Sequence, residues 1–286
     1  MIKTIKIKNL IGIITLLILA FFMIYPIIFL IVGSIMGDSE LRANLSPLFL
    51  STPTYIKWSL LPLYPTLVHY VELLLDSPEY YVMFWNSFKI VAGILFGQLV
   101  IGMPCAWGFA RFQFKGKKFL FFLYIALMLL PFQVLMLSEY IVLDSLNLID
   151  TLWSIILPGA FSTFPVFIMY HYFATLPKEI MEAAKLDGAS ELKLFIDFGL
   201  PLGRPGILSA LVLGFLEFWN LIEQPITFLE TQKKWPLSMY LPNITTKNAG
   251  VAFAISVVTL LPPLIVFLIG ERYLEEGIAV TGSKES

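Results

Sequence analysis

Residues 175–206 read TLPKEIMEAAKLDGASELKLFIDFGLPLGRPG and interrupt an otherwise apolar chain with an amphipathic pattern. Pro177 suits the first turn of a helix, and Gly188 suits the turn that ends it. Ser190 is a favourable N-cap for a second helix, which Pro201 is expected to stop. We therefore expect a compact helix–turn–helix unit, exposed between two longer apolar segments, that forms a docking site for a soluble partner.

The apolar segments on either side dominate the composition. Of the 286 residues, 58% are hydrophobic and 14% are charged, and the mean hydropathy is +0.83, whereas soluble domains carry about 25% charged residues. This composition excludes an ordinary cytosolic enzyme, a disordered chain and a nucleic-acid-binding protein with a basic face. Runs long enough to cross a ~30 Å hydrocarbon core as helices lie at residues 10–36, 82–109, 119–137, 151–173, 205–222 and 251–269. The sequence predicts an all-α polytopic membrane protein with six transmembrane helices in a single domain, residues 1–286.

Lysine and arginine residues set the predicted orientation. Most of the 19 lie in the N-terminal tail, the 110–118 loop, the 174–204 segment and the C-terminal tail. Cytoplasmic loops of membrane proteins carry such an excess of positive charge. We therefore expect both termini and the amphipathic unit in the cytoplasm, and the loops 37–81 and 223–250 outside.

Residue types that carry catalysis or bind metals are scarce. Cys105 is the single cysteine, and His69 and His171 are the two histidines, so no cluster has metal-ligand spacing. The sequence contains no G-x-x-x-x-G-K-[ST] phosphate loop, no G-x-S-x-G and no H-E-x-x-H. We expect no catalytic residue, no metal and no cofactor in this chain, and no nucleic-acid partner.

The spacing within the amphipathic unit resembles the EAA loop of ABC importer permeases. The pattern of that loop is EAA, three residues, G, nine residues, I, one residue and LP, and it is matched from Glu182 to Pro201, with Phe198 in place of isoleucine. Further similar stretches are NSFKIVAG at 86–93, ARFQFKGKK at 110–118, FWN at 218–220 and ERYLEEGIAVTGS at 271–283. Together they resemble the maltose-type, carbohydrate-uptake permeases, on the MalG-like side of the heterodimer.

This resemblance implies the fold of a type I ABC importer permease, whose cytoplasmic EAA coupling loop would span residues 175–202. The coupling helix would be seated in a groove of an ATP-hydrolysing subunit, where small side chains allow close approach and carboxylates pair with cations of the partner. The coupling residues implied are Glu182, Ala183, Ala184, Asp187 and Gly188.

The same resemblance implies a non-catalytic subunit that moves a sugar or oligosaccharide across the bacterial cytoplasmic membrane by alternating access. Its implied partners are a homologous second permease, two ABC ATPase subunits that bind ATP and Mg²⁺, an extracytoplasmic solute-binding protein and membrane lipid. The outer segment Lys233–Pro236 would either meet the binding protein or close the assembly.

Polar residues inside the predicted spans are candidates for the solute pathway, because burying them in a bilayer is costly. Glu217 and Asn220 lie at i,i+3 on the predicted fifth span, and Gln98 lies near the middle of the second. Their side chains could hydrogen-bond sugar hydroxyls. Alternatively, Glu217 is protonated or pairs with Lys89, and the two amides only hold helices together.

Other functions remain compatible with the sequence. An importer of glycerol phosphate or a modified sugar would have the same architecture, although an anion is expected to recruit Lys or Arg to its cavity, and Lys89 is the one candidate. An ion-coupled secondary carrier is expected to show an internal repeat or several buried acids, and Glu217 is the one such acid that we predict. An intramembrane enzyme such as a protease is not supported, because the sequence contains none of the catalytic motifs named above.

Overall fold

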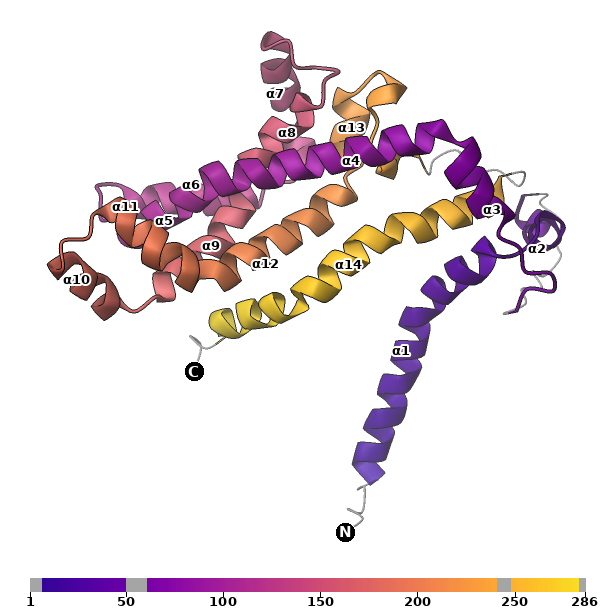
Figure 1. The fold of residues 1–286 in the computed structure, drawn as a ribbon, viewed down its shortest axis with the longest axis horizontal. Coiled ribbons are helices and arrows are strands. Elements are labelled where there is room, and N and C mark those ends of the chain that lie inside the picture. Colours follow the sequence, from indigo (N-terminus) through magenta and orange to yellow (C-terminus); the bar gives the residue numbers. More distant parts are fainter. Residues whose placement is uncertain (1–6, 50–60, 241–247, 283–286) are drawn as a thin grey trace. The chain divides into compact units, whose positions relative to one another are not determined.

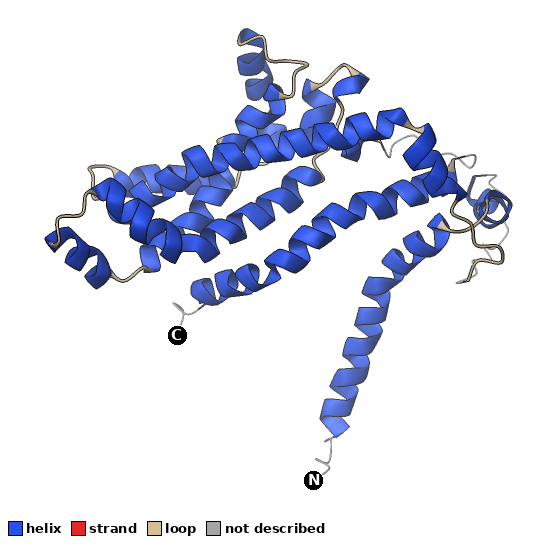
Figure 2. Cartoon of the chain, in the orientation of Figure 1, coloured by secondary structure: helices blue, strands red, loops and turns tan. Residues whose placement is uncertain are grey.

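The computed structural model describes residues 7–49, 61–240 and 248–282. Within these ranges every regular element is a helix or helical turn, and none is a strand (Figure 2). Five helical segments are long and apolar enough to cross a membrane, or six if one bent pair is counted as a span. The prediction of an all-α membrane fold is therefore confirmed.

The described chain divides into two compact units, and the first combines residues 1–80 with 241–261. It holds α1 (Ile7–Ser34), α2 (Asp38–Phe49), α3 (Val68–Val71), a π-helical turn (Glu72–Asp76) and the beginning of α14 (Ala249–Gly282). A small core of Met36, Leu41, Leu45 and Ala249 forms where α1 ends. The ring of buried His69 is fixed there, because its Nε2 lies 3.0 Å from the carbonyl oxygen of Met36.

The second unit combines residues 81–240 with 262–286 and begins within one long helical segment, Pro78–Arg111. This segment consists of α4 (Pro78–Gly97), a π-helical turn (Gln98–Gly102) and α5 (Met103–Arg111). It extends beyond both ends of the predicted span 82–109. Glu79 lies in its first turn and Arg111 in its last, where each charge is favourable to the helix dipole.

The predicted span 119–137 is not one straight helix. The structure has α6 (Lys117–Met128) and α7 (Phe132–Ser145), bent by 102° at the intervening residues. Pro131 accounts for the break, because it has no N–H to donate and it disfavours helical geometry at the preceding residue. Pro131 is extended, with ψ 150°, and stands immediately before α7.

The predicted span 151–173 corresponds to two helices of one candidate membrane segment, α8 (Trp153–Ala160) and α9 (Thr163–Thr175), separated by Phe161 and Ser162. After α9, the chain forms the predicted helix–turn–helix unit. It contains α10 (Lys178–Leu186), α11 (Glu191–Leu194) and a π-helical turn (Phe195–Gly199), and we call residues 178–199 the hairpin.

The expectation that Pro201 stops the second helix is wrong. Residues from Glu191 to Trp219 form one helical segment, in which α12 (Leu200–Trp219) directly continues the hairpin. The reason is that Pro201 lies in the first turn of α12, directly after the π-helical turn, where a missing N–H is tolerated. The predicted boundaries 175–202 and 205–222 therefore cut through a single element.

The core of the second unit lies between α5, α9 and α12, which run alongside one another (Figure 1). Trp107 and Phe173 are its central rings, 5.3 Å apart and edge to face. Glycines on α12 let the backbone approach these rings: a Cβ at Gly199 would lie 2.7 Å from Trp107, and one at Gly203 would overlap Phe173. Small residues have this role at helix contacts in membranes.

After α12 the chain forms α13 (Glu223–Phe228) and two short 3₁₀ turns, Gln232–Lys234 and Leu237–Met239. The last helix, α14, extends well beyond the predicted span 251–269, and its candidate membrane segment is Ala249–Glu275. In the second unit, Ser209 on α12 holds this helix, because its hydroxyl donates to the carbonyl of Tyr273 at 2.6 Å.

Candidate functional site

The hairpin presents one apolar face to its own chain and leaves the other free. Met181 and Ala184 of α10 are buried in the core cluster that also contains Trp107. On the other side, Glu182 and Ala183 are exposed. The expectation that both alanines face a partner is therefore corrected, because Ala184 packs inward and Ala183 alone is available.

The exposed face ends in an unusual apolar side chain. Leu186, the last residue of α10, is 90% exposed, and Leu192 on α11 is 67% exposed. Neither lies in an apolar run of a predicted span. Two leucines held in solvent next to charged residues indicate a contact surface, because burial of such side chains is favourable.

The turn of the hairpin has the geometry predicted for Gly188. Its φ is +82°, its N–H donates to Lys185 at 3.0 Å, and the N–H of Ala189 donates to Ala184 at 3.0 Å, so the two bonds form a Schellman motif. A Cβ at Gly188 would meet nothing within 4 Å. The left-handed backbone therefore favours glycine here, and no atom of the described chain crowds the position; Asp187 precedes it in an exposed position.

Two side-chain interactions fix the start of α11. The hydroxyl of Ser190 accepts a hydrogen bond from the N–H of Lys193 at 3.3 Å, so its predicted role as N-cap is confirmed. Across the turn, Lys185 Nζ lies 2.6 Å from Glu191 Oε1. The pair is about half exposed, so it contributes little stability and mainly orients the two arms.

A hollow of about 270 Å³ lies between the hairpin and the end of α5. Its walls include Glu182 from α10 and Arg111 from α5. Arg111 donates to the carbonyl of Leu176 at 3.2 Å, and its guanidinium lies 5.3 Å from the ring centroid of Trp107. Glu182 is therefore placed beside cationic groups of its own chain, and Asp187 is not part of this lining.

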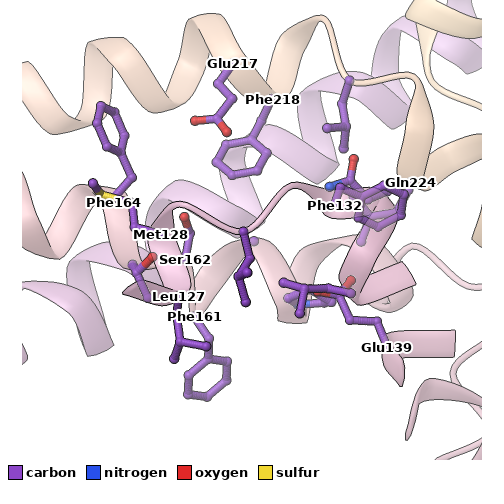
Figure 3. A pocket seen from close by; sticks show the side chains of 17 residues that line it. Leu127, Met128, Phe132, Glu139, Phe161, Ser162, Phe164, Glu217, Phe218 and Gln224 are labelled. Carbon is purple, nitrogen blue, oxygen red and sulfur yellow. The ribbon is translucent and has the colours of Figure 1, made fainter. Parts of the chain in front are cut away.

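A second cavity, of about 360 Å³, lies elsewhere in the same unit, among α6, α7, α8, α9, α12 and α13 (Figure 3). Glu217 reaches it from α12, with the carboxylate directed toward the cavity. Other polar groups in the lining are Glu139, Gln224, Ser162 and Thr163. Four phenylalanines complete it: Phe132, Phe161, Phe164 and Phe218.

Glu139 is a site residue that the sequence analysis missed. It lies on α7, beyond the end of the predicted span 119–137, so the sequence placed it in an outer loop. Its Oε2 is buried and has no hydrogen-bond partner within the described part of the chain. The signal that could have found it is Pro131, because a bend there turns the following helix back against its neighbours.

The other two predicted pathway residues are not brought to this cavity. Asn220 follows the last residue of α12, and its side-chain amide donates to the carbonyl of Leu216 at 2.9 Å. Gln98 is 2% exposed, and its Nε2 donates to the carbonyl of Gly159 at 3.0 Å. The amide of Gln98 thus joins two helices.

The alternative partner predicted for Glu217 is also elsewhere. Lys89 is exposed on α4, is not part of the cavity lining, and forms no ion pair with Glu217. Glu217 is therefore the one predicted pathway residue that the structure places at the cavity.

The loops at the opposite end from the hairpin are joined through Asp150, in an arrangement that we call the outer clip. Asp150 Oδ1 accepts from the N–H groups of Glu230 and Thr231 at 3.0 and 2.9 Å. Oδ2 accepts from the hydroxyl of Thr231 at 2.7 Å and lies 2.6 Å from Lys234 Nζ. The ammonium group and these donors hold the pKa of the Asp150 carboxyl well below its ordinary value.

The segment after the outer clip is held against α4. Asn86 donates to the carbonyls of Lys233 and Trp235 at 2.8 and 3.1 Å, and Ser87 accepts from the N–H of Leu237 at 2.8 Å. The NSFKIVAG stretch was noted by resemblance alone, and the structure gives its first two residues this bracing role. The segment 229–240 is thus a fixed surface.

Comparison with known proteins gives a family match to the model described as "Binding-protein-dependent transport system inner membrane component", over residues 98–280. This match covers more than half of the chain, including the hairpin and all the residues that line the second cavity.

Individual relatives are similar over most of their length. The arabinooligosaccharides transport system permease protein AraQ of Halalkalibacterium halodurans is 29% identical over 93% of each chain. The sn-glycerol-3-phosphate transport system permease protein UgpE of Yersinia enterocolitica is 28% identical over 71% of this chain and 74% of its own. A crystal structure of a bacterial ABC transporter involved in the import of the acidic polysaccharide alginate contains a chain with the same fold, with a TM-score of 0.78 and 22% identity, covering 95% of this chain and 98% of that one.

Proposed function

The chain belongs to the inner membrane components of binding-protein-dependent transport systems, and from that premise we propose that it is the permease subunit of an ATP-driven importer of a sugar or oligosaccharide. The observation that carries the proposal is the hairpin, with its ordered glycine turn and an outward face of Glu182, Ala183 and Leu186. AraQ, similar over nearly the whole length, is named for arabinooligosaccharide transport, which supports a carbohydrate as the solute.

The coupling step follows from the continuity of the helix that leaves the hairpin. A soluble ATPase subunit binds the outward face of α10, and Leu186 enters an apolar depression on that subunit. Closure of two ATPase subunits around ATP and Mg²⁺ draws the coupling helices together. Because residues 191–219 form one helical segment, this displacement reaches the membrane part of the chain as a rigid-body movement. The permease pair then alternates between outward and inward access.

The remaining partners occupy other surfaces. A homologous second permease forms the other half of the pathway, lipid surrounds the exposed apolar helices, and both termini lie in the cytoplasm of a bacterial cell. An extracytoplasmic solute-binding protein docks on the outer side, where the outer clip keeps segment 229–240 in one conformation. This chain performs no catalysis, and its partners bind the nucleotide.

Import of a phosphorylated solute is the second candidate, favoured by one observation. UgpE, a relative over about three quarters of its own length, is named for sn-glycerol-3-phosphate transport. The two candidates differ in the charge of the solute, and the charge of the cavity lining bears on this question.

The decisive experiment is affinity purification of the full chain from its native membrane, with an ATPase assay on the material that co-purifies. We expect a homologous permease and an ATPase subunit to co-purify. Leu186→Ser is expected to reduce the recovered ATPase several-fold. It removes most of the apolar area that the leucine buries at the contact, and burial of one leucine contributes about 2 kcal/mol of free energy.

The matched control is Phe112→Ser, which removes an apolar side chain, 43% exposed, from the neighbouring loop. This variant should retain the ATPase. Recovery of the chain without any ATPase, in wild type as in the variant, would contradict the proposed function and favour a carrier that works alone.

A further inference from the structure

The 360 Å³ cavity lies where two helical segments are interrupted and a third helix ends. Its lining includes Leu130 at the α6–α7 bend, Ser162 at the α8–α9 break, and Leu221 just after α12. At membrane depth, backbone that leaves helical geometry is tolerated where it is buried in protein or faces water, because its peptide groups need hydrogen-bond partners. Broken helices therefore commonly surround the solute sites of transporters. This location is the first observation that points to a ligand.

The polar groups of the lining suit a solute that donates hydrogen bonds. Glu139 and Glu217 offer carboxylate oxygens, which only accept hydrogen bonds when ionised. The buried Oε2 of Glu139 has no partner within the described residues, so its accepting capacity is unused. Gln224 and Ser162 can both donate and accept. Hydroxyl groups around a sugar ring match such a set.

The apolar part of the lining suits the same kind of solute. Phe132, Phe164 and Phe218 are aromatic residues of the lining, and Figure 3 shows Phe218 beside Glu217. A sugar has polar edges and apolar C–H faces, so it can lie against a phenyl ring while its hydroxyls reach the carboxylates. Apolar side chains combined with a few convergent polar groups are typical of small-molecule sites.

The charge of the lining is one-sided. Among the described residues that form it, none is lysine, arginine or histidine, while two are glutamates. Lys89, the one cation that the sequence offered for an anionic solute, lies outside the lining. A phosphate or carboxylate entering this space would meet like charge without a counter-charge, and like-charge juxtaposition opposes binding.

We propose that this cavity is a solute-contacting part of the transport pathway that admits uncharged, hydroxyl-rich solutes and excludes anionic ones, with Glu139 and Glu217 as the residues that determine this selectivity. The proposal rests on the proposed importer function and specifies its substrate class. It sets this chain apart from relatives whose names refer to a phosphorylated solute.

The test measures the potential inside the cavity with charged thiol reagents. Ser162→Cys places a thiol on the cavity wall, in a Cys105→Ser background and in the full complex with its partner subunits. We compare its modification rates by 2-(trimethylammonium)ethyl methanethiosulfonate, a cation, and 2-sulfonatoethyl methanethiosulfonate, an anion. Relative to an exposed reference thiol at Ser145→Cys on α7, the cation should be favoured about tenfold, since a like-signed cleft concentrates counter-ions by at least that factor.

Two sets of carboxyl variants assign the effect. The first is a double variant in which Glu139 and Glu217 are both replaced by glutamine. It should lower the ratio of cation to anion modification rates to that of the reference thiol, because each substitution keeps the shape of the side chain and removes its charge. Glu223→Gln is the matched control. Glu223 lies on α13, outside the lining, and accepts from Gln133 at 2.6 Å, so its substitution should leave the ratio high.

The solute itself provides the final comparison. In the complex with the binding protein, a neutral trisaccharide that the binding protein accepts should slow modification of the Ser162→Cys thiol, and the aldonic acid made by oxidising its reducing end should not. A ratio equal to the reference thiol, a ratio unchanged in the double Gln variant, or equal protection by both sugars would each overturn the proposal. None of these results would affect co-purification with the ATPase. Failure of the proposed charge selectivity can therefore be distinguished from failure of the proposed importer function.

Discussion

At the scale of single residues, Asp150 has an unusually complete set of partners for a surface carboxylate. Both oxygens are occupied, by Glu230, Thr231 and Lys234, and the backbone of Asp150 has a positive φ of 56°. Asparagine also tolerates a left-handed backbone. Asp150→Asn therefore removes the charge and keeps the local conformation, which makes it a clean probe of the outer clip.

We expect Asp150→Asn to expose segment 229–235 to faster proteolysis at neutral pH and to lower the melting temperature of the purified chain. Because the pKa of Asp150 is lowered in the folded state, its contribution is present above the ordinary carboxyl value of 3.8 and is lost as the pH falls through the lowered folded value. The difference in melting temperature between wild type and variant should thus be constant between about pH 5 and 8 and shrink in stronger acid.

The matched control is Asp144→Asn, a change at an exposed carboxyl on α7. It should leave both the proteolysis rate and the melting temperature as they are in wild type. Equal behaviour of the two variants at neutral pH would show that the outer clip does not hold the segment.

At the scale of elements, the second arm of the hairpin depends on its first residue. Ser190→Ala removes the acceptor for the N–H of Lys193, and loss of such an N-cap costs about 1 kcal/mol. Amide hydrogen exchange over residues 191–194 should accelerate about fivefold, the factor that this free energy corresponds to. Ser190→Asp keeps an acceptor and should restore protection, and equally fast exchange in both variants would contradict the capping role.

The contact between α9 and α12 depends on the absence of a side chain at Gly203. Gly203→Ala would drive a Cβ into the ring of Phe173, which is 0% exposed. We expect a loss of about 1–3 kcal/mol in the free energy of unfolding, as for other overpacked cores, measured by thermal unfolding in detergent.

The control for this prediction is Gly12→Ala on α1, where a Cβ meets nothing within 4 Å. Alanine is the better helix former by about 1 kcal/mol, so this variant should be neutral or slightly stabilising. A Gly203→Ala protein as stable as Gly12→Ala would mean that the two helices can separate without cost.

At the scale of the whole molecule, the all-α membrane fold followed from the sequence because uncharged runs of about twenty residues have few other stable states. The hairpin followed as well, since Gly188 and Ser190 act through their own backbone and immediate neighbours. The sequence-based predictions that were wrong concern places where the local structure depends on a distant or compensating element. Pro201 was expected to end a helix, and the adjacent π-helical turn allows the helix to continue.

The candidate site was less predictable than the fold. Glu217 could be identified because it is an acid in an apolar run, but Glu139 reaches the same cavity only through the bend at Pro131. Asp150 and Lys234 are far apart in sequence, and nothing local indicates that their loops meet. Whether an amide such as Gln98 joins helices or lines a cavity depends on helix rotation, which apolar runs do not specify.

The length of the continuous helix that leaves the hairpin has a consequence for the size of the movement it can transmit. The 29 residues from Glu191 to Trp219 make a helix about 43 Å long at 1.5 Å per residue, with the hairpin at one end and the cavity glutamate near the other. A rod of that length works as a lever: a tilt of about 10° around one end carries the other by about 7 Å. In the proposed coupling step, a small rotation at the hairpin would therefore displace the cavity end of this helix by roughly the width of a sugar ring, without any further moving element between the two.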